Sequence, residues 1–212
     1  EILSRAIEAA EGFGGFVMIH IGNNPTSLNS LMDKLRPGDV ITHSFHGFED
    51  GVLEESGTVL EGMKEVQKRG VFIDIGHGAG SFSFRAARKA LENGLLPDTI
   101  STDISTISIE GPVYDLLTTM SKMMHLGMTL DQVVERSTYI PARAMRLDHR
   151  IGTLRIGSDG DVVIMRLQDG VFTMYDRLST MTKLGSAKKW EIGTSIEASS
   201  RLFHEHTVAD GR

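Results

Sequence analysis

The chain has 212 residues, of which 40% are hydrophobic, and this is enough to bury a continuous core. Its 22 basic and 28 acidic residues give a formal net charge of -6, which offers no basic stripe for phosphate backbones, so we expect no nucleic-acid partner. The sequence contains no cysteine, so disulfides, thiolate metal sites and a cysteine nucleophile are excluded, and any metal must be held by histidine and carboxylate side chains.

The start of the chain gives no sign of a targeting or membrane segment. No apolar run reaches the roughly 20 residues that a membrane helix needs, and no basic segment followed by an apolar one opens the sequence. We therefore expect a soluble, cytoplasmic protein. The first residue, Glu1, is not an initiator methionine, and residues 1–15 are typical of the end of an amphipathic helix. We expect a chain that starts within a fold.

Four short β-rich runs predict strands that are buried on both faces. They occupy residues 16–21, 39–43, 71–76 and 99–104. Each run ends at or next to a polar residue, in order His20, His43, His77 and Asp103. The intervals between these polar residues suit βα units, which need about 25–35 residues including the crossover helix.

Helical patterns lie between these runs and after the last one. Helix-forming residues followed by glycine or Pro-Gly predict helices at 27–38, 61–70 and 84–94. Two more helices are expected at 112–127 and 129–137, the second opened by a capping box of Thr129 and Gln132. This alternation is typical of an α/β fold with a parallel sheet.

The sequence changes character near Asp148. Residues 151–176 alternate short β-type runs with Gly-Ser-Asp-Gly and Gln-Asp-Gly turns, which predicts an antiparallel meander. We therefore expect a small appended β element. For residues 177–212 the pattern indicates only loop that could include edge strands.

The polar residues at the strand ends are candidate site residues, because the carboxyl ends of parallel strands converge on one face of an α/β barrel. His20 and His43 offer imidazole nitrogens that suit Zn²⁺ and related ions, while Asp103 can bind a metal, take a proton or do both. A single histidine at a strand end is more often a hydrogen-bonded structural residue. Three in succession, followed by an aspartate, favour a site. His46 is either a group that supports the site or contacts substrate, or an exposed loop histidine.

Residues 76–80, Gly-His-Gly-Ala-Gly, suggest a different function. They follow a predicted strand, precede a predicted helix and lie upstream of Asp103, as in a Rossmann site where glycines admit a pyrophosphate and an acidic residue binds ribose. However, the spacing is G-x-G-x-G instead of G-x-G-x-x-G, and this interpretation leaves His20 and His43 without a role. The glycines could equally permit a sharp turn beside a crowded strand end.

Five segments of the chain resemble the amidohydrolase superfamily and, within it, the dihydroorotase-like deacetylase branch. They are VMIHIGNNP at 17–25, DVITHSFHG at 39–47, FIDIGHGAGSFSF at 72–84, ISTDIS at 100–105 and TYIPARAMRLDHRIGTLRIGSDGDVVIM at 138–165. The last segment is the most specific, because Pro-Ala-Arg, Gly-Thr-Leu, a Gly-Ser-Asp-Gly turn and Asp-Val-Val are typical of the superfamily's return from barrel to β-sandwich.

The resemblance implies the C-terminal half of a (β/α)8 TIM-type barrel, strands five to eight, over residues 1–147. A C-terminal β-sandwich segment and tail would occupy residues 148–212. The family's strand-one His-x-His pair and its carboxylated strand-four lysine have no counterpart in this sequence. Half a barrel leaves strand edges open, so we expect either a missing N-terminal half or self-association into a homo-oligomer.

The resemblance also implies roles for the candidate residues. His20 and His43 correspond to the ends of strands five and six, which bind the second metal. Asp103 corresponds to the strand-eight aspartate, which binds the first metal and transfers the proton. His77 corresponds to a strand-seven position at which a substrate contact is expected, and we assign the same role to His46.

The implied activity is hydrolysis of an amide or ester bond in a small molecule, with removal of an acetyl group as one case. One or two divalent ions, zinc by ligand type, would activate the attacking water and polarise the carbonyl. Two alternatives remain open. The chain could be an inactive fragment that keeps the fold but lacks a complete metal site, or a nucleotide-binding domain that uses residues 76–80.

Overall fold

The computed structural model describes residues 1–176 and 195–208. Three short strands, β1 (Met18–His20), β2 (Val40–Thr42) and β3 (Phe72–Ile73), form a parallel sheet in the order β1-β2-β3. The α/β class expected from the sequence is thereby confirmed. Because the strands are parallel and neighbouring, their carboxyl ends lie along one edge of the sheet.

The fourth predicted strand, at 99–104, extends the same sheet beside β3 without a regular ladder. Asp74 and Thr99 form an isolated parallel bridge. The N–H groups of His77 and Gly78 then donate to the carbonyls of Ser101 and Thr102, at 3.1 and 2.9 Å. The residue that follows, Asp103, therefore lies at the same edge as the ends of β1 and β2.

The first four helices alternate with the strands as expected. They are α1 (Ile2–Gly12), α2 (Leu28–Met32), α3 (Glu61–Lys68) and α4 (Phe84–Glu92). The predicted range 27–38 was too long for α2, because after Met32 the backbone tightens into turns in which Lys34 donates to Leu31 and Leu35 to Met32. Pro37 then has no N–H with which to continue a helix.

Three further helices follow the sheet: α5 (Leu116–His125), α6 (Leu130–Ser137) and α7 (Tyr139–Ala144). α5 begins later than its predicted start at 112, because the Asp115 side chain caps the helix by accepting from the Thr118 N–H. The capping box of Thr129 and Gln132 opens α6 as predicted. The short α7 was not predicted from the sequence.

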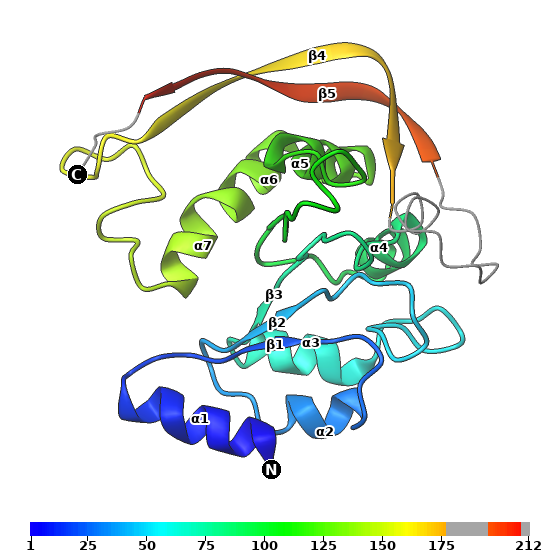
Figure 1. Cartoon of the computed structure of the whole chain (residues 1–212), viewed down its shortest axis with the longest axis vertical. Coiled ribbons are helices and arrows are strands. Elements are labelled where there is room, and N and C mark those ends of the chain that lie inside the picture. The colour runs from blue at the N-terminus through cyan, green and yellow to red at the C-terminus, as the bar shows by residue number, and fades with distance from the viewer. Residues whose placement is uncertain (177–194, 209–212) are drawn as a thin grey trace.

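The C-terminal element is a long two-stranded antiparallel ribbon of β4 (Val162–Tyr175) and β5 (Ser195–Val208). The predicted meander was wrong in detail, since Gln168-Asp169-Gly170 lies within β4 at a register irregularity instead of forming a turn. The partner strand comes from the region for which only loop and edge strands were expected, and residues 177–194 lie outside the described part. Figure 1 shows the ribbon arching over α5 and α6.

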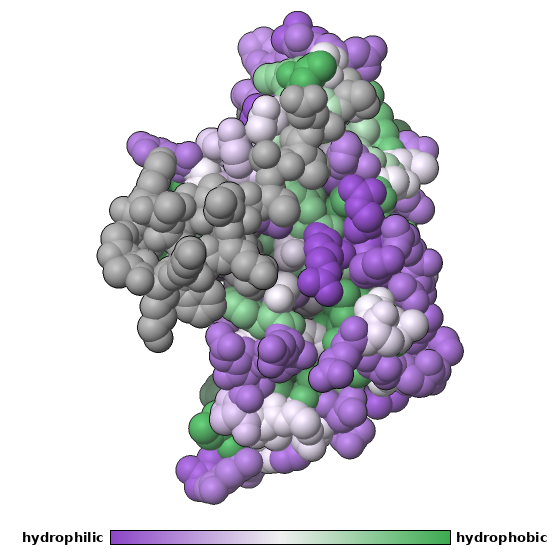
Figure 2. Space-filling model, turned by 90° about the vertical axis from the view of Figure 1, so that its right-hand side faces the viewer, coloured by the Kyte–Doolittle hydropathy of each residue, from purple (hydrophilic) through white to green (hydrophobic). Residues whose placement is uncertain are grey.

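The core is formed where helices pack against the sheet. Its most buried side chains include Ile41 of β2, Ile73 of β3 and Ile75 just after β3, with Met63 of α3 and Ala87 of α4. The helices thus hold the strands and fix the positions of their ends. On the face drawn in Figure 2, hydrophobic residues appear as small patches among hydrophilic ones. Among the described helices, none combines the length and apolar character needed to cross a membrane.

Candidate metal and catalytic site

The ends of β1 and β2 bring two of the candidate histidines into contact. His20 is the last residue of β1 and is paired in register with Thr42, which immediately precedes His43. The two imidazole rings meet edge to face, with centroids 4.2 Å apart. The strand register therefore produces a pair of adjacent imidazoles from residues far apart in sequence.

His43 is held in one orientation by the backbone. Its side chain is buried, and its Nδ1–H donates to the Gly76 carbonyl at 2.5 Å. Because Nδ1 carries the proton, the lone pair lies on Nε2, which is 3.9 Å from Asp103 Oδ2. A metal-binding histidine is typically fixed in this way, with one ring nitrogen bonded to a carbonyl and the other facing the site.

Asp103 completes the group of predicted residues at this edge. Its backbone has φ of 44°, and its side chain is 60% exposed, so the carboxylate is accessible. Oδ2 packs against Gly78, where an added Cβ would lie only 2.7 Å away. The structure therefore brings His20, His43 and Asp103 together, as the strand-end argument predicted, while their roles stay predictions.

The glycines of residues 76–80 are explained by this crowding. Gly76 has φ of 47°, and a Cβ there would lie 2.1 Å from Thr42 Oγ1 and 2.8 Å from His43 Nδ1. Gly78 similarly passes against Asp103. At both glycines the space that a ligand would need is filled by other atoms of the protein. The next helix, α4, begins only at Phe84. The dinucleotide hypothesis has no support in this geometry, whereas the sharp-turn explanation agrees with it.

A buried carboxylate beneath the site was missed in the sequence. Asp74 accepts hydrogen bonds from the hydroxyls of Thr42, Thr99 and Ser101, at 2.6, 2.5 and 2.7 Å. These three residues lie on β2 and on the run before Asp103. The signal that could have revealed Asp74 is a charged residue inside an apolar strand, flanked in the sheet by strands that carry hydroxyls near their ends.

The electrostatics of the pair favour a neutral His20. Burial lowers the pKa of His20, the neighbouring His43 ring lowers it further, and the Asp103 carboxylate opposes both effects. His20 thus stays neutral to lower pH than a free histidine. A neutral imidazole has a lone pair to offer a cation.

His77 lies in the interior instead of facing the sheet edge. Its ring is fully buried, stacks on Phe82 and has both nitrogens engaged, Nδ1 with the Gly78 carbonyl at 2.9 Å and Nε2 with Lys122 Nζ at 2.7 Å. In this arrangement neither nitrogen is presented to a substrate, which departs from the role that the resemblance implied. Lys122 was not singled out in the sequence, although it stands among methionines in the helical run.

His46 is buried, in contrast to the exposed loop histidine considered as an alternative. Its Nδ1 accepts from the Phe48 N–H at 3.1 Å. Gly22 and Gly51 pass close to the ring, and a Cβ on Gly51 would lie 3.0 Å from His46 Cε1. His46 therefore packs beneath the two loops that follow β1 and β2, and a direct substrate contact by His46 stays a prediction.

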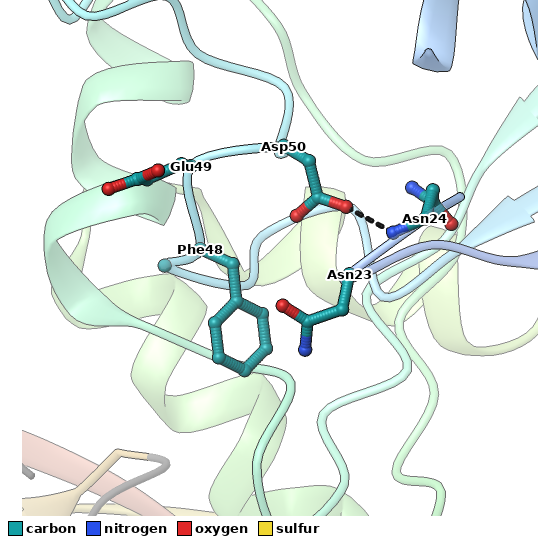
Figure 3. A pocket seen from close by; sticks show the side chains of 6 residues that line it. Asn23, Asn24, Phe48, Glu49 and Asp50 are labelled. Atoms are coloured by element: carbon teal, nitrogen blue, oxygen red, sulfur yellow. Dashed lines mark hydrogen bonds between the residues drawn. The ribbon is translucent and has the colours of Figure 1, made fainter. Parts of the chain in front are cut away.

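Those two loops enclose a pocket of about 420 Å³, lined by Asn23, Asn24, Gly47, Phe48, Glu49 and Asp50. In Figure 3 the Asn23 side chain and the Phe48 ring lie close to each other, while Glu49 points away. Asp50 accepts from the Asn24 N–H at 2.6 Å. Burial raises the pKa of Asp50, but backbone N–H groups of Asn24 and Asn23 outweigh it and the net pKa is lowered. The pocket therefore carries acidic side chains, and its lining begins three residues after His20 in the chain.

Comparison with known proteins decides the family. The sequence profile described as Amidohydrolase family matches residues 1–191, which is most of the chain. The chain belongs to the amidohydrolase family. The resemblance to the amidohydrolase superfamily that the five sequence segments indicated is thereby confirmed.

The relatives of this amidohydrolase are longer proteins. A deacetylase from Enterococcus faecalis is 39% identical over 162 residues, which cover 76% of this chain and 44% of that protein. A deacetylase from Agrobacterium fabrum is 36% identical over 190 residues, which cover 88% of this chain and 46% of that protein. The chain thus spans about half the length of the curated relatives it matches.

Two solved structures resemble this amidohydrolase closely. An adenine deaminase superposes with a TM-score of 0.85 at 33% identity, covering 98% of this chain and 52% of its own. A dihydroorotase superposes with a TM-score of 0.84 at 30% identity, and the match covers 99% of this chain and 53% of the dihydroorotase chain. The similarity extends along nearly all of this chain, so the fold is that of the family.

The donor set of this amidohydrolase suits a divalent ion in its chemistry, since two imidazoles and a carboxylate lie at one sheet edge. Within residues 1–176 and 195–208, no group of three or more histidine, aspartate or glutamate side chains is already close enough to hold an ion. His20, His43 and Asp103 lie at one sheet edge without forming such a group, and their assignment as metal ligands stays a prediction.

Proposed function

We propose that the complete protein containing this chain is a metal-dependent hydrolase that cleaves an amide or ester bond of a small molecule. The observation that carries the proposal is the convergence of His20, His43 and Asp103 at one sheet edge, with His43 Nε2 3.9 Å from Asp103 Oδ2. Removal of an acetyl group is the specific case we favour, because the curated relatives at 35–39% identity are called deacetylases.

We also propose that residues 1–147 are strands five to eight of a (β/α)8 barrel and that residues 148–212 belong to a C-terminal β-sandwich segment. The parallel order of β1, β2 and β3 and the alternating helices support this. The relatives are about twice as long as the matched region. Strands one to four would then supply the remaining metal ligands.

Each residue at the edge has a task in this proposal. His20 and His43 would hold one divalent ion, and Asp103 a second. When bound, such ions, zinc by donor type, supply an activated water and polarise the scissile carbonyl. Asp103 Oδ2 accepts the proton of the attacking water and passes it to the leaving amine or alkoxide. Because the Asp103 carboxylate is exposed, it can contact both the attacking water and the leaving group.

The pocket formed by the loops after β1 and β2 would hold the part of the substrate that does not react. Its amide and aromatic side chains, Asn23 and Phe48, suit a polar group attached to an apolar one, and its acidic residues suit a cationic substituent. His46 would support this pocket from below through its contacts with Gly22 and Gly51. His77 would act through the protein interior instead of touching the substrate.

The direct test measures acetate release by the complete protein from a panel of N-acetyl amino acids and acetyl esters. Activity should be lost after chelation and return with zinc. Asp103→Asn should lower kcat by about 10²–10⁴-fold because the proton acceptor is lost. Asp33→Asn, at an exposed aspartate after α2, is the matched control and should leave kcat unchanged. Metal-independent release, or an active Asp103→Asn variant, would contradict the proposal.

A second candidate is that this polypeptide alone is an inactive member of the family. It is favoured by the partial ligand set within the described residues. Metal analysis of the 212-residue chain, with an assay of acetate release, tests this second candidate. Binding well below one ion per chain, together with no acetate release, would support the inactive fragment, whereas stoichiometric metal and turnover would exclude it.

A further inference from the structure

Lys122, in the last turn of α5, is fully buried. Burying an ammonium group costs free energy unless the group is hydrogen-bonded. Lys122 Nζ donates to the Pro112 carbonyl and to His77 Nε2, both at 2.7 Å. The rings of Phe82 and Phe84 lie 5.8 and 6.0 Å from Nζ. The role of Lys122 therefore depends on what its partner His77 contacts.

His77 transmits the contact to the backbone. Because Nε2 accepts from Lys122, the ring proton lies on Nδ1, which donates to the Gly78 carbonyl at 2.9 Å. Phe82 stacks on the ring with centroids 4.5 Å apart and an interplanar angle of 20°. The ring therefore has one orientation, and it holds the Gly78 peptide in place.

The segment 76–78 contacts both sides of the candidate site. The Gly76 carbonyl accepts from His43 Nδ1 at 2.5 Å. Gly78 packs against Asp103 Oδ2, and its N–H donates to the Thr102 carbonyl at 2.9 Å. A shift of this short segment would therefore move His43 and Asp103 relative to each other.

We propose that Lys122 is a positioning residue that, through His77, holds segment 76–78 and thereby sets the distance between His43 Nε2 and Asp103 Oδ2. Its effect on turnover rests on the proposed function, but its effect on the geometry of His43 does not. Lys122 lies in the core and touches neither His43 nor Asp103, so it acts through its neighbours.

The hydrogen bond between Lys122 and His77 forms whether or not Lys122 is charged. Burial lowers the pKa of Lys122 to about 7, while Asp176 and Asp115 raise it and Arg201 lowers it. Burial, and then Lys122 itself, hold the pKa of His77 well below its usual value, so His77 stays a neutral acceptor. Because both the amine and the ammonium form of lysine carry N–H donors, the bond to His77 persists through the titration of Lys122.

The first experiment replaces Lys122 by methionine, which keeps the length of the side chain but removes the donor. In the complete metal-loaded protein we expect kcat to fall about 10–100-fold with KM nearly unchanged, as for losses of groups that orient ligands. The downfield proton resonance of His43 Nδ1–H should shift, because its bond to Gly76 is disturbed. Lys89→Met, at an exposed lysine paired with Glu92, is the control and should change neither quantity.

A double variant separates positioning from packing. Lys122→Met with His77→Phe removes both partners of the Lys122–His77 bond, so no imidazole nitrogen is left without its donor, while the carbonyls of Pro112 and Gly78 lose the bonds that these side chains gave them. We expect kcat to stay low and the His43 resonance to stay displaced in this variant, because no side chain then holds the Gly78 carbonyl. Wild-type kcat and an unshifted His43 resonance in either variant would overturn the proposal.

The wild-type protein gives a measurement that does not depend on whether any variant folds. Its nitrogen-15 spectrum should show His77 neutral, with the proton on Nδ1 and the lone pair on Nε2. The opposite tautomer would overturn the proposal. If the wild-type protein hydrolyses no substrate, the proposed function fails, and the tautomer of His77 and the resonance of His43 still decide the positioning role.

Discussion

Gly78 and Asp103 approach so closely that position 78 has no room for a side chain. In Gly78→Ala the new Cβ would lie 2.7 Å from Asp103 Oδ2, and the residue has φ of 52°. The backbone cost is about 1–2 kcal/mol, while the carboxylate tip is exposed and able to move aside. We therefore expect a folded protein in which the displaced Asp103 lowers kcat at least tenfold. Parallel melting curves and kinetics measure this, and unchanged kcat would contradict it.

Gly76 provides the matched comparison, because its neighbours are fixed. A Cβ at this position would lie 2.1 Å from Thr42 Oγ1 and 3.1 Å from the backbone nitrogen of His43. Neither the strand end nor the buried threonine can yield without loss of packing. Gly76→Ala should lower the free energy of unfolding by more than about 2 kcal/mol, and more than Gly78→Ala does, in urea titrations. The reverse order would disprove this explanation of the two glycines.

Lys122 should make stability depend on pH. Its folded pKa of about 7 lies below the 10.5 of the free side chain. Below pH 7 both states hold the proton, and the cost of the buried charge is fully present. Between about 7 and 10.5 the unfolded state holds more protons, so the free energy of unfolding rises with pH, by at most about 1.4 kcal/mol per unit.

Urea titrations at pH 7, 8 and 9 test this effect of Lys122. Lys122→Met removes the titrating group, so the wild-type protein should gain stability relative to the variant as the pH rises. The other charged or titratable groups near Lys122 are His77, Asp176, Asp115 and Arg201, and all are retained in the variant. Parallel stability curves for the two proteins would show that Lys122 keeps its ordinary pKa.

At the residue scale, the sequence was most informative about side chains at strand ends. The proximity of His20, His43 and Asp103 follows from the spacing of the predicted strands and the parallel topology alone, since parallel strand ends share an edge. Lys122 was not predictable in this way, because a lysine in a methionine-rich helix is usually one whose charged end reaches solvent. Its burial depends on His77, a partner 45 residues away in the chain, and only the tertiary structure brings the two together.

At the scale of elements, the Ser121 hydroxyl helps connect the C-terminal ribbon to α5, together with the bond from Arg201 Nη2 to Thr118 Oγ1. Ser121 Oγ on α5 accepts from the buried Leu202 N–H of β5 at 2.9 Å and donates to the Leu117 carbonyl at 2.6 Å. Ser121→Ala would leave the Leu202 N–H without its acceptor. We expect a loss of about 1–3 kcal/mol and faster hydrogen exchange in β5.

Ser137, at the end of α6, is the matched control for Ser121. Its Oγ is buried, and among the described residues it has no hydrogen-bond partner. Ser137→Ala removes a polar group that gains nothing from burial, so stability should stay equal or rise. Equal losses in the two variants would show that the ribbon is not held through Ser121.

A helix end was predictable where a capping motif marks it locally. Thr129 and Gln132 opened α6 as expected. The Gln168-Asp169-Gly170 run carries an equally clear turn signal, yet it lies inside β4. The pairing with β5 along both flanks outweighs the local preference, and the register irregularity accommodates the glycine. That pairing partner lies beyond residue 194, so no local pattern could indicate it.

At the scale of the whole molecule, the sheet carries apolar side chains at both of its edges. Within the described residues β1 pairs only with β2, and Met18 is 55% exposed. Beyond Asp103 at the other edge, Ile104, Ile107 and Ile109 are 45%, 51% and 55% exposed. In the proposed barrel these edges would face strands four and one.

The isolated 212-residue polypeptide should therefore associate with itself, because an open strand edge with apolar side chains pairs with another chain. Met18→Lys should weaken this association, since a charged residue on an edge strand opposes pairing. Met145→Lys, at a methionine with 56% exposure after α7, is the control and should leave association unchanged. Sedimentation velocity over a concentration series measures the effect, and a monomeric wild-type chain at high concentration would contradict the open-edge interpretation.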